Sequence, residues 1–264
     1  MKKYFVIGNP IDHSLSPKLH NHWFKEHNID AIYDKKKIDE QDLQNIIFEI
    51  KEKKVNGINV TVPFKKKVIP YLDKLSPEAE QTQSVNTIVL TNDILVGHNT
   101  DISGFTKAIK NLNFNIKNKK IFILGAGGVV PSIIYALGKM EVSEIIISNR
   151  TRQKAENIKN QFDNIKIINW GELCNFDVII NATSLGLNEE SFDINFSKIG
   201  KNKLFYDVIY NPSETNFLKE GKKTLNQVEN GKLMFVYQAL EAFKLWHGIK
   251  PEINKNALEL LEND

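Results

Sequence analysis

The stretch Ile121–Leu137, IFILGAGGVVPSIIYAL, decides the fold of the second half of the chain. It begins as a short apolar run typical of a buried strand, passes through the glycine-rich segment Gly125–Gly128 and continues with the apolar spacing of a helix. Glycines there allow a tight turn and let backbone amides approach a pyrophosphate at the positive end of the helix. Val130 occupies the third glycine position of the usual motif, so the motif alone is weak evidence for a dinucleotide site.

Strand and helix patterns alternate on both sides of this stretch. Further strands are predicted after it at residues 143–149, 165–169, 177–184 and 203–210. Helices are predicted at residues 152–162 and from 232 to the end. This order is typical of a Rossmann-type half with extra strands.

The first hundred residues also alternate between the two patterns. Strands are predicted at residues 4–8, 31–38 and 57–62, with a pair of strands around the turn at 91–93. Helices are predicted to begin at Ser16-Pro17, at residue 42 and at Pro63-Phe64. A helix capped by Asp101 then connects the halves. The predicted fold class is therefore α/β, with a mostly parallel sheet in the N-terminal domain.

Composition limits the classes of protein that the chain can represent. Of the 264 residues, 41% are hydrophobic and 25% are charged, which is typical of a globular protein large enough for two domains. The net charge of +3 gives no argument for nucleic acid or an anionic membrane, and no run approaches the roughly 20 apolar residues of a membrane span. The single Cys174 excludes an intramolecular disulfide and fits a reducing compartment. We therefore expect a cytoplasmic protein.

The end of the strand predicted at 143–149 indicates which dinucleotide binds. An NAD enzyme carries an acidic residue there to hold the ribose 2′-hydroxyl, whereas this chain has Asn149, Arg150 and Thr151. Arg150 and Arg152 are the only arginines of the chain, and a guanidinium binds phosphate in a bidentate way that lysine cannot. The pattern favours the 2′-phosphate of NADP over two surface arginines at the start of a helix.

Polar residues also follow two predicted strands in the first half. In INVTVPFKKK, Asn59 and Thr61 share one face of a strand, and Lys65 comes just past its carboxyl end. Ser14 and Ser16 follow the first strand, where open α/β sheets bind ligands. By spacing alone, the serines are equally well explained as a helix cap, and the three lysines as a solvated charge run.

Nine short motifs follow one another along the chain: SLSP, NVTVPFK, SVNT, NTDISG, GAGG, NRT, NATSLG, DVIYNPSET and YQALEAF. In this order they resemble the shikimate dehydrogenase family over nearly the whole chain. The resemblance implies an N-terminal substrate domain, a C-terminal Rossmann-type NADP domain and a cleft between them. It also implies the reversible reduction of 3-dehydroshikimate to shikimate with NADPH, a step towards aromatic amino acids. A small-molecule substrate is expected as partner, with the chain as a monomer or a homodimer.

The resemblance also implies domain boundaries and residue roles. Residues 1–101 would bind substrate, residues 102–235 would bind NADP, and the helices from about 236 to 264 would return to the first domain. The implied catalytic pair is Lys65 and Asp101, so the solvated interpretation is kept only for the other two lysines. The implied substrate-binding residues are Ser14, Ser16, Asn59, Thr61, Asn86, Tyr210 and Gln238. The implied cofactor-binding residues are Gly125, Ala126, Gly127, Gly128, Val129, Asn149, Arg150, Thr151, Arg152, Lys154, Thr183, Val208 and Gly231.

Two other enzyme classes have sequence features in their favour. Tyr33 and Lys37 have the Tyr-x-x-x-Lys spacing of short-chain dehydrogenases, but they precede the glycine loop and lie on a predicted strand. His13, His20 and His22 suggest a metal hydrolase. Positions i and i+2 of a helix face apart, however, and no carboxylate cluster supports these histidines. Neither class is favoured, and no metal is expected.

Two relatives on the same fold remain as alternatives. One is a quinate/shikimate dehydrogenase that uses NAD, against which Arg150 argues because it stands where an NAD enzyme carries an acid. The other is a non-catalytic ligand-binding relative, since a fold does not fix a function. The presence of both Lys65 and Asp101 argues against it, because a binding module needs no such pair.

Overall fold

The structure is a computed structural model that describes residues 1–188, 190–197 and 199–261. It divides into two compact units, of which the first comprises residues 1–104 together with the chain from residue 236 onward, and the second comprises residues 105–235. The sequence predicts boundaries after residues 101 and 235. The assignment of substrate to the first unit and cofactor to the second stays a prediction.

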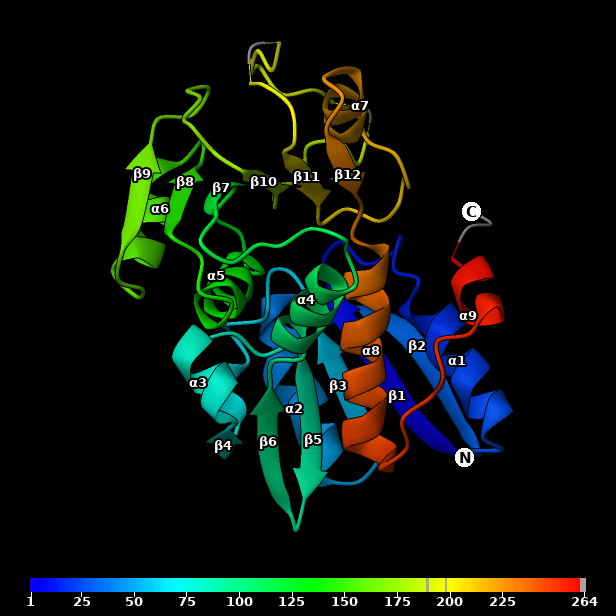
Figure 1. Cartoon of the computed structure of the whole chain (residues 1–264). Coiled ribbons are helices and arrows are strands. Elements are labelled where there is room, and N and C mark those ends of the chain that lie inside the picture. The colour runs from blue at the N-terminus through cyan, green and yellow to red at the C-terminus, as the bar shows by residue number, and fades with distance from the viewer. Residues whose placement is uncertain (189, 198, 262–264) are drawn as a thin grey trace. The chain divides into compact units, whose positions relative to one another are not determined.

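In its described residues, the first unit has a six-stranded mixed sheet (Figure 1). Its strands are β1 (Lys2–Gly8), β2 (Ala31–Lys37), β3 (Gly57–Val60), β4 (Lys74–Leu75), β5 (Thr87–Thr91) and β6 (Ile94–His98). Their order in the sheet is β2-β1-β3-β5-β6-β4. β5 is antiparallel to both of its neighbours, and the other pairs are parallel.

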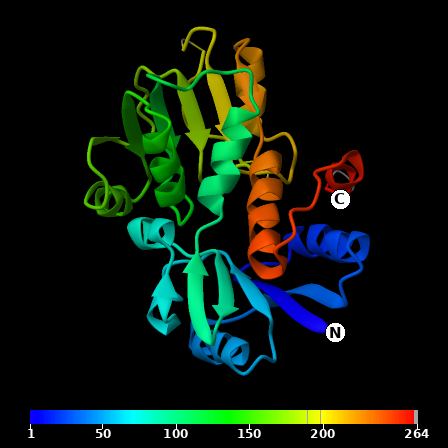
Figure 2. The ribbon, with the colours of Figure 1, turned by 60° about the horizontal axis from the view of Figure 1, so that its bottom comes forward.

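Helices cover both faces of this sheet. They are α1 (Ser16–Glu26), η1 (Glu40–Asp42), α2 (Leu43–Lys51), η2 (Ile69–Tyr71), α3 (Pro77–Thr82), α8 (Lys232–His247) and α9 (Lys255–Glu259). Figures 1 and 2 show α2 and α8 on opposite faces. Alternation along β1 explains this, because the Tyr4 ring contacts Trp246 of α8, whereas Ile7 joins the core that contains Ile47 and Ile50 of α2.

The second unit has a parallel sheet in the order of dinucleotide-binding folds. Its strands are β7 (Lys120–Leu124), β8 (Glu144–Ser148), β9 (Ile165–Ile168), β10 (Val178–Asn181), β11 (Leu204–Asp207) and β12 (Gln227–Glu229). Figure 1 shows them side by side in the order β9-β8-β7-β10-β11-β12. Every neighbouring pair is parallel. Counted from β7, this is the 3-2-1-4-5-6 order of a Rossmann fold, and the predicted fold class is confirmed.

The helices of the second unit follow its strands. They are α5 (Val130–Lys139), α6 (Arg152–Lys159) and α7 (Asn216–Lys223), while α4 (Asp101–Lys110) begins in the first unit and ends in the second. Phe217 and Leu218 of α7 belong to the same buried core as Phe122 of β7. The β7–α5 junction falls at residues 125–129, so the glycine segment lies between a strand and a helix, as its sequence predicts.

The prediction that a helix begins at Pro63-Phe64 is wrong. Turns occupy this stretch until the short 3-10 segment η2. The carbonyl of Lys65 accepts a hydrogen bond from Val85 N at 2.8 Å, a partner distant in sequence, instead of the amide four residues later. Pro70 also lacks the N–H that a continuing helix would need. Three-dimensional pairing therefore overrides the local pattern here.

Candidate active site

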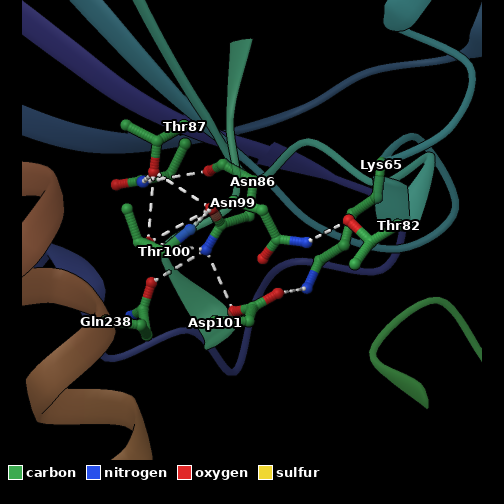
Figure 3. A network of polar contacts seen from close by, with 9 residues as sticks. Lys65, Thr82, Asn86, Thr87, Asn99, Thr100, Asp101 and Gln238 are labelled. Carbon is green, nitrogen blue, oxygen red and sulfur yellow. Dashed lines mark hydrogen bonds and ion pairs between the residues drawn. The ribbon is translucent and has the colours of Figure 1, made fainter. Parts of the chain in front are cut away.

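Asn86 lies at the centre of a buried polar network in the first unit (Figure 3). Its Nδ2 donates to Thr100 Oγ1 at 2.8 Å and to Asp101 Oδ1 at 2.9 Å. Its Oδ1 accepts from the backbone N–H of Thr100 at 2.7 Å. Its own backbone is held on both sides, since its carbonyl accepts from Val60 N and its amide donates to the carbonyl of His98. Strand pairing thus sets the position of the Asn86 side chain.

The Lys65 ammonium forms an ion pair with Asp101 at one end of this network. The distance from Nζ to Oδ2 is 2.5 Å, and the two side chains are 11% and 8% exposed. Asp101 is the first residue of α4, where the partial positive charge of a helix N-terminus favours a carboxylate. Because Asn86 binds the second carboxylate oxygen, the carboxylate is fixed in orientation. The arrangement presents a buried ammonium with further N–H donors for a ligand.

The neighbouring lysines differ from Lys65 in their surroundings. Lys66 and Lys67 are exposed, and Lys67 forms an ion pair with Glu40. Of the three consecutive lysines, Lys65 joins the buried network, and its two neighbours lie at the surface as their predicted role requires.

The other predicted substrate-binding residues of the first unit lie on α1, β3 and α8 or directly beside them. Ser16 is buried at the start of α1 and its backbone N–H is 3.4 Å from Ser14 Oγ. Thr61 follows β3 directly, and its backbone N–H donates to Ile7 of β1. Gln238 of α8 extends towards Asn86, with Oε1 3.4 Å from Nδ2. Asn59 and Asn86 are joined by a hydrogen bond from the Asn59 side chain to the Asn86 carbonyl.

Tyr210, also predicted to bind substrate, belongs to the second unit. Its ring stacks on Phe235 with centroids 4.4 Å apart. The Tyr210 ring is therefore packed against a neighbour of its own unit. Its contact with substrate stays a prediction.

The glycine loop of the second unit has a backbone that only glycine adopts easily. Gly125 has a φ of +112°, and a side chain there would lie 2.7 Å from the carbonyl oxygen of Ala182. The Gly125 amide donates to Ser148 at the end of β8. Gly127 and Gly128 are exposed. The loop between Ala126 and Val129 therefore presents backbone rather than side chains at the start of α5.

The arginine pair at the end of β8 has two different environments. Arg150 is exposed. Arg152 Nε is 3.1 Å from Glu156 Oε1, and its guanidinium also donates to Asn169 Oδ1. The turn between them is held by Asn149 Nδ2, which donates to the carbonyl of Thr151, and the Lys154 amide donates to the same carbonyl. Both guanidiniums are thus exposed, and that of Arg152 is already bound by Glu156 and Asn169.

A second buried network orders the strand ends around Thr183. Asn181 Oδ1 accepts from the amide and the hydroxyl of Thr183, and Asn181 Nδ2 donates to Asp207 Oδ1 at 3.0 Å. Asp207 is fully buried, and burial raises its pKa to about 6. Thr183 is therefore oriented from beneath by side chains at the ends of β10 and β11.

Val208 and Gly231 approach each other closely. A side chain at position 231 would lie 2.0 Å from the carbonyl oxygen of Val208, and the Gly231 amide donates to Ile209 at 3.0 Å. Only glycine fits this contact without a backbone shift. Two predicted cofactor residues that are distant in sequence are thus neighbours.

Sequence reasoning missed several members of these networks. Thr87 and Thr100 bind Asn86, and Thr215 donates from its hydroxyl to Asp207 Oδ2 at 2.6 Å. Thr87 and Thr100 adjoin predicted site residues in the motifs SVNT and NTDISG, so their position was a usable signal. Asp207 and Thr215 begin and end the motif DVIYNPSET, and Asp207 adjoins the predicted cofactor residue Val208, so the same signal was present there.

The histidines of the metal-hydrolase alternative do not form a ligand set. His20 is fully buried and its ring stacks on Tyr33 at 4.3 Å, while burial lowers its pKa to about 3 and keeps it neutral. Among the described residues, no three His, Cys, Asp or Glu side chains are grouped to hold a metal ion. Within the same residues, no helix combines the length and apolar character needed to cross a membrane.

Three family models match the chain. The shikimate dehydrogenase substrate binding domain matches residues 6–88, the shikimate / quinate 5-dehydrogenase model matches residues 106–204, and the shikimate 5′-dehydrogenase C-terminal domain matches residues 233–255. The first of these matches lies within the first unit, and the second lies within the second unit.

Individual relatives cover the whole chain. The shikimate dehydrogenase (NADP(+)) of Pelagibacter ubique is 55% identical over 99% of this chain and 100% of its own length. The crystal structure of shikimate dehydrogenase from Aquifex aeolicus is 36% identical, with a TM-score of 0.91 over 100% of this chain and 98% of that one. That of shikimate 5-dehydrogenase from Thermus thermophilus, in complex with NADP(H) and shikimate, is 29% identical, with a TM-score of 0.90 over 99% and 98%.

Proposed function

Because the chain belongs to the shikimate dehydrogenase family, we propose that it catalyses the reversible, NADP-dependent reduction of 3-dehydroshikimate to shikimate, a step towards aromatic amino acids. The observation that carries the proposal is the buried pair of Lys65 and Asp101. It occurs in a chain whose second sheet has dinucleotide-binding order. A positioned proton donor and a dinucleotide fold are the two requirements for reducing a ketone by hydride transfer.

The residues of the second unit fit NADP. Backbone at Gly127 is exposed, and a side chain built there would meet only the Ala182 carbonyl, at 3.8 Å, so the loop has room for a pyrophosphate beside α5. Arg150 would bind the 2′-phosphate, and Thr183, Val208 and Gly231 would lie near the adenosine or nicotinamide portions. When bound, NADPH supplies the hydride for the ketone carbon of the substrate.

Lys65 would then complete the reduction. As the ketone oxygen gains negative charge, Lys65 Nζ donates a proton to it, a contribution of about 10²- to 10⁴-fold for a positioned acid. Asp101 holds the ammonium in place, and Asn86 holds Asp101. In the reverse direction the neutral Lys65 amine accepts the proton of the substrate hydroxyl. The carboxylate and the remaining hydroxyls are assigned to the predicted substrate-binding residues Ser14, Ser16, Thr61, Asn86, Tyr210 and Gln238. Asn59, which was also predicted to bind substrate, would support the site through its hydrogen bond to the Asn86 carbonyl.

We also propose a working compartment and an assembly. A single cysteine suits the reducing cytoplasm. Burial raises the Cys174 pKa to about 11, which keeps the thiol protonated and unreactive. The chain is proposed to act as a monomer or a homodimer, which sedimentation equilibrium would distinguish.

The test is to mix the purified chain with shikimate or quinate and either NADP or NAD, and to follow the absorbance of reduced nicotinamide. Turnover with NADP and little with NAD is expected. Turnover with quinate and NAD would assign the chain to the broader quinate/shikimate group instead. A folded chain without turnover on any of these combinations would overturn the proposal in favour of the ligand-binding alternative.

A further inference from the structure

Tyr33 of β2 reaches into the active-site network across an intervening strand. Its hydroxyl is 2.6 Å from Asn59 Oδ1. β1 lies between β2 and β3, and its residues Tyr4 and Val6 pair with Tyr33 and Asn59 respectively. Because Tyr4 and Val6 are two residues apart, all four side chains lie on the same face of the sheet. The Tyr33 ring therefore spans one strand to place its hydroxyl on Asn59.

Hydrogen bonding fixes the direction of this contact. Asn59 Nδ2 is 3.0 Å from the carbonyl oxygen of Asn86 and 2.9 Å from Thr87 Oγ1. A backbone carbonyl only accepts, so the amide nitrogen must face it and the amide oxygen must face Tyr33. Tyr33 is consequently the donor. Both amide hydrogens of Asn59 are used within the protein, so this side chain supports the site and has no hydrogen left to give a ligand.

Packing holds the Tyr33 ring in this position. The ring is 1% exposed and stacks on His20 with an interplanar angle of 3°. Its backbone is bound on both sides by the Asn21 side chain, which accepts from the Tyr33 amide at 2.9 Å and donates to the Tyr33 carbonyl at 2.8 Å. A buried donor with so little freedom is suited to fixing the orientation of a partner.

We infer that Tyr33 is a positioning residue for the reaction, acting through Asn59 on Asn86 and Thr87. Asn86 in turn binds the Asp101 carboxylate that holds the Lys65 ammonium. The inference rests on the proposed function. Removing the Tyr33 hydroxyl leaves Asn59 Oδ1 buried without that donor, and the amide is then free to rotate away from Thr87. The Asn86 carbonyl would lose a fixed partner, and the geometry of the ion pair would loosen.

The test is Tyr33→Phe, which keeps the ring and its stack on His20. We expect kcat for shikimate oxidation to fall about 10-fold, because small displacements of a catalytic group are costly, while the dissociation constant of NADP is unchanged. Tyr4→Phe is the matched control, since Tyr4 packs in the same aromatic cluster against Trp246. It should keep kcat within about two-fold of wild type, as a substitution away from the network.

A double-mutant cycle separates positioning from general stability. In an Asn59→Ala background, Tyr33→Phe should change kcat by less than about two-fold, because the residues act as one unit. An equal loss in both backgrounds would overturn the inference, and so would full kcat in the single variant.

If Tyr33→Phe does not fold, Thr87→Val breaks the same chain of hydrogen bonds beyond Asn59. A matching loss of kcat with unchanged NADP binding would then support the inference, and wild-type kcat would overturn it. Wild-type turnover is measured first, because its absence would contradict the proposed function itself.

Discussion

Asp101 of the first unit and Asp207 of the second are both buried, yet they are satisfied in opposite ways. Asp101 accepts from a charged group, the Lys65 ammonium, and from the Asn86 amide. Asp207 accepts from neutral donors: the Thr215 hydroxyl at 2.6 Å, the Asn181 amide at 3.0 Å and the Ile209 backbone at 3.0 Å. A charged partner gives a carboxylate a transferable proton next to it, whereas neutral donors give it only rigidity.

If the proposed function is right, the difference separates a network used for chemistry from one used for shape. The first unit places an ammonium at the end of its network, where the proposed reaction needs a proton donor. The second unit uses its buried aspartate to join β10, β11 and the turn before α7, and so to orient Thr183 and Ile209. Experiments that remove one member from each network can break or sharpen this contrast.

The largest effect is expected for Lys65→Ala. Turnover should fall by at least about 100-fold because the proton donor is lost, with little change in the KM of shikimate. Lys66→Ala removes an exposed neighbouring lysine and is the matched control. Equal kcat values for Lys65→Ala and wild type would sink the catalytic assignment and with it the chemical side of the contrast.

The second effect is a pH dependence of stability that Asp207 contributes. Burial raises the pKa of its carboxyl from 3.8 to about 6, so between these pH values the folded chain holds a proton that the unfolded chain has released. Its contribution to the free energy of unfolding is therefore full below about pH 4 and is lost as the pH rises through 6. The loss amounts to at most about 3 kcal/mol at about 1.4 kcal/mol per pH unit.

Urea unfolding of wild type and Asp207→Asn across this range measures that contribution. Burial lowers the pKa of His20 to about 3 and of His247 to about 4, so both histidines make stability rise with pH below about 6.5. They act equally in the two proteins and cancel in the difference. A difference that does not change with pH would mean that Asp207 is ionised throughout, as a charged partner would make it.

Much of the second unit could be predicted from its sequence because its signals are local. A strand, a glycine turn and a helix are adjacent in Ile121–Leu137, and the structure has β7, a loop with Gly125 at positive φ, and α5 there. In the first unit, the hairpin of β5 and β6 around residues 91–93 was predictable for the same reason, since its turn residues lie between the two strands that they join.

The parts that could not be predicted depend on contacts between distant residues. Turns replace the expected helix after Pro63 because Val85 takes the carbonyl of Lys65. Tyr33 meets Asn59 only because β1 brings their strands into register, and no spacing along the chain records this. Lys65 shows how little spacing alone can tell. Its spacing favoured a solvated charge, and only the family resemblance indicated a catalytic role.

A smaller effect is expected for Arg150→Ala in the second unit. Loss of an exposed guanidinium should weaken NADPH binding about 10-fold, the scale of a charge-assisted hydrogen bond, and leave NADH binding nearly unchanged. Arg152→Ala is the comparison, because Glu156 and Asn169 already engage that guanidinium. The Arg150 effect should shrink at high salt, since exposed charges are screened, whereas the buried Lys65 effect should not. Equal losses for NADPH and NADH would contradict the phosphate-binding role.

The smallest effect compares two glycines of the second unit, one in the glycine loop and one near the end of α5. Gly138 is exposed near the end of α5, and a side chain there would meet nothing within 4 Å. Gly138→Ala should therefore raise the free energy of unfolding by about 0.5 kcal/mol, because alanine loses less backbone entropy in a helix. Gly125→Ala should lower it instead, since position 125 combines a φ of +112° with a carbonyl 2.7 Å away. Urea unfolding of both variants measures the opposite signs. Destabilisation by Gly138→Ala would show that α5 does not tolerate an added methyl group even where its surroundings are open. The rigidity of the second unit would then extend beyond the network around Asp207.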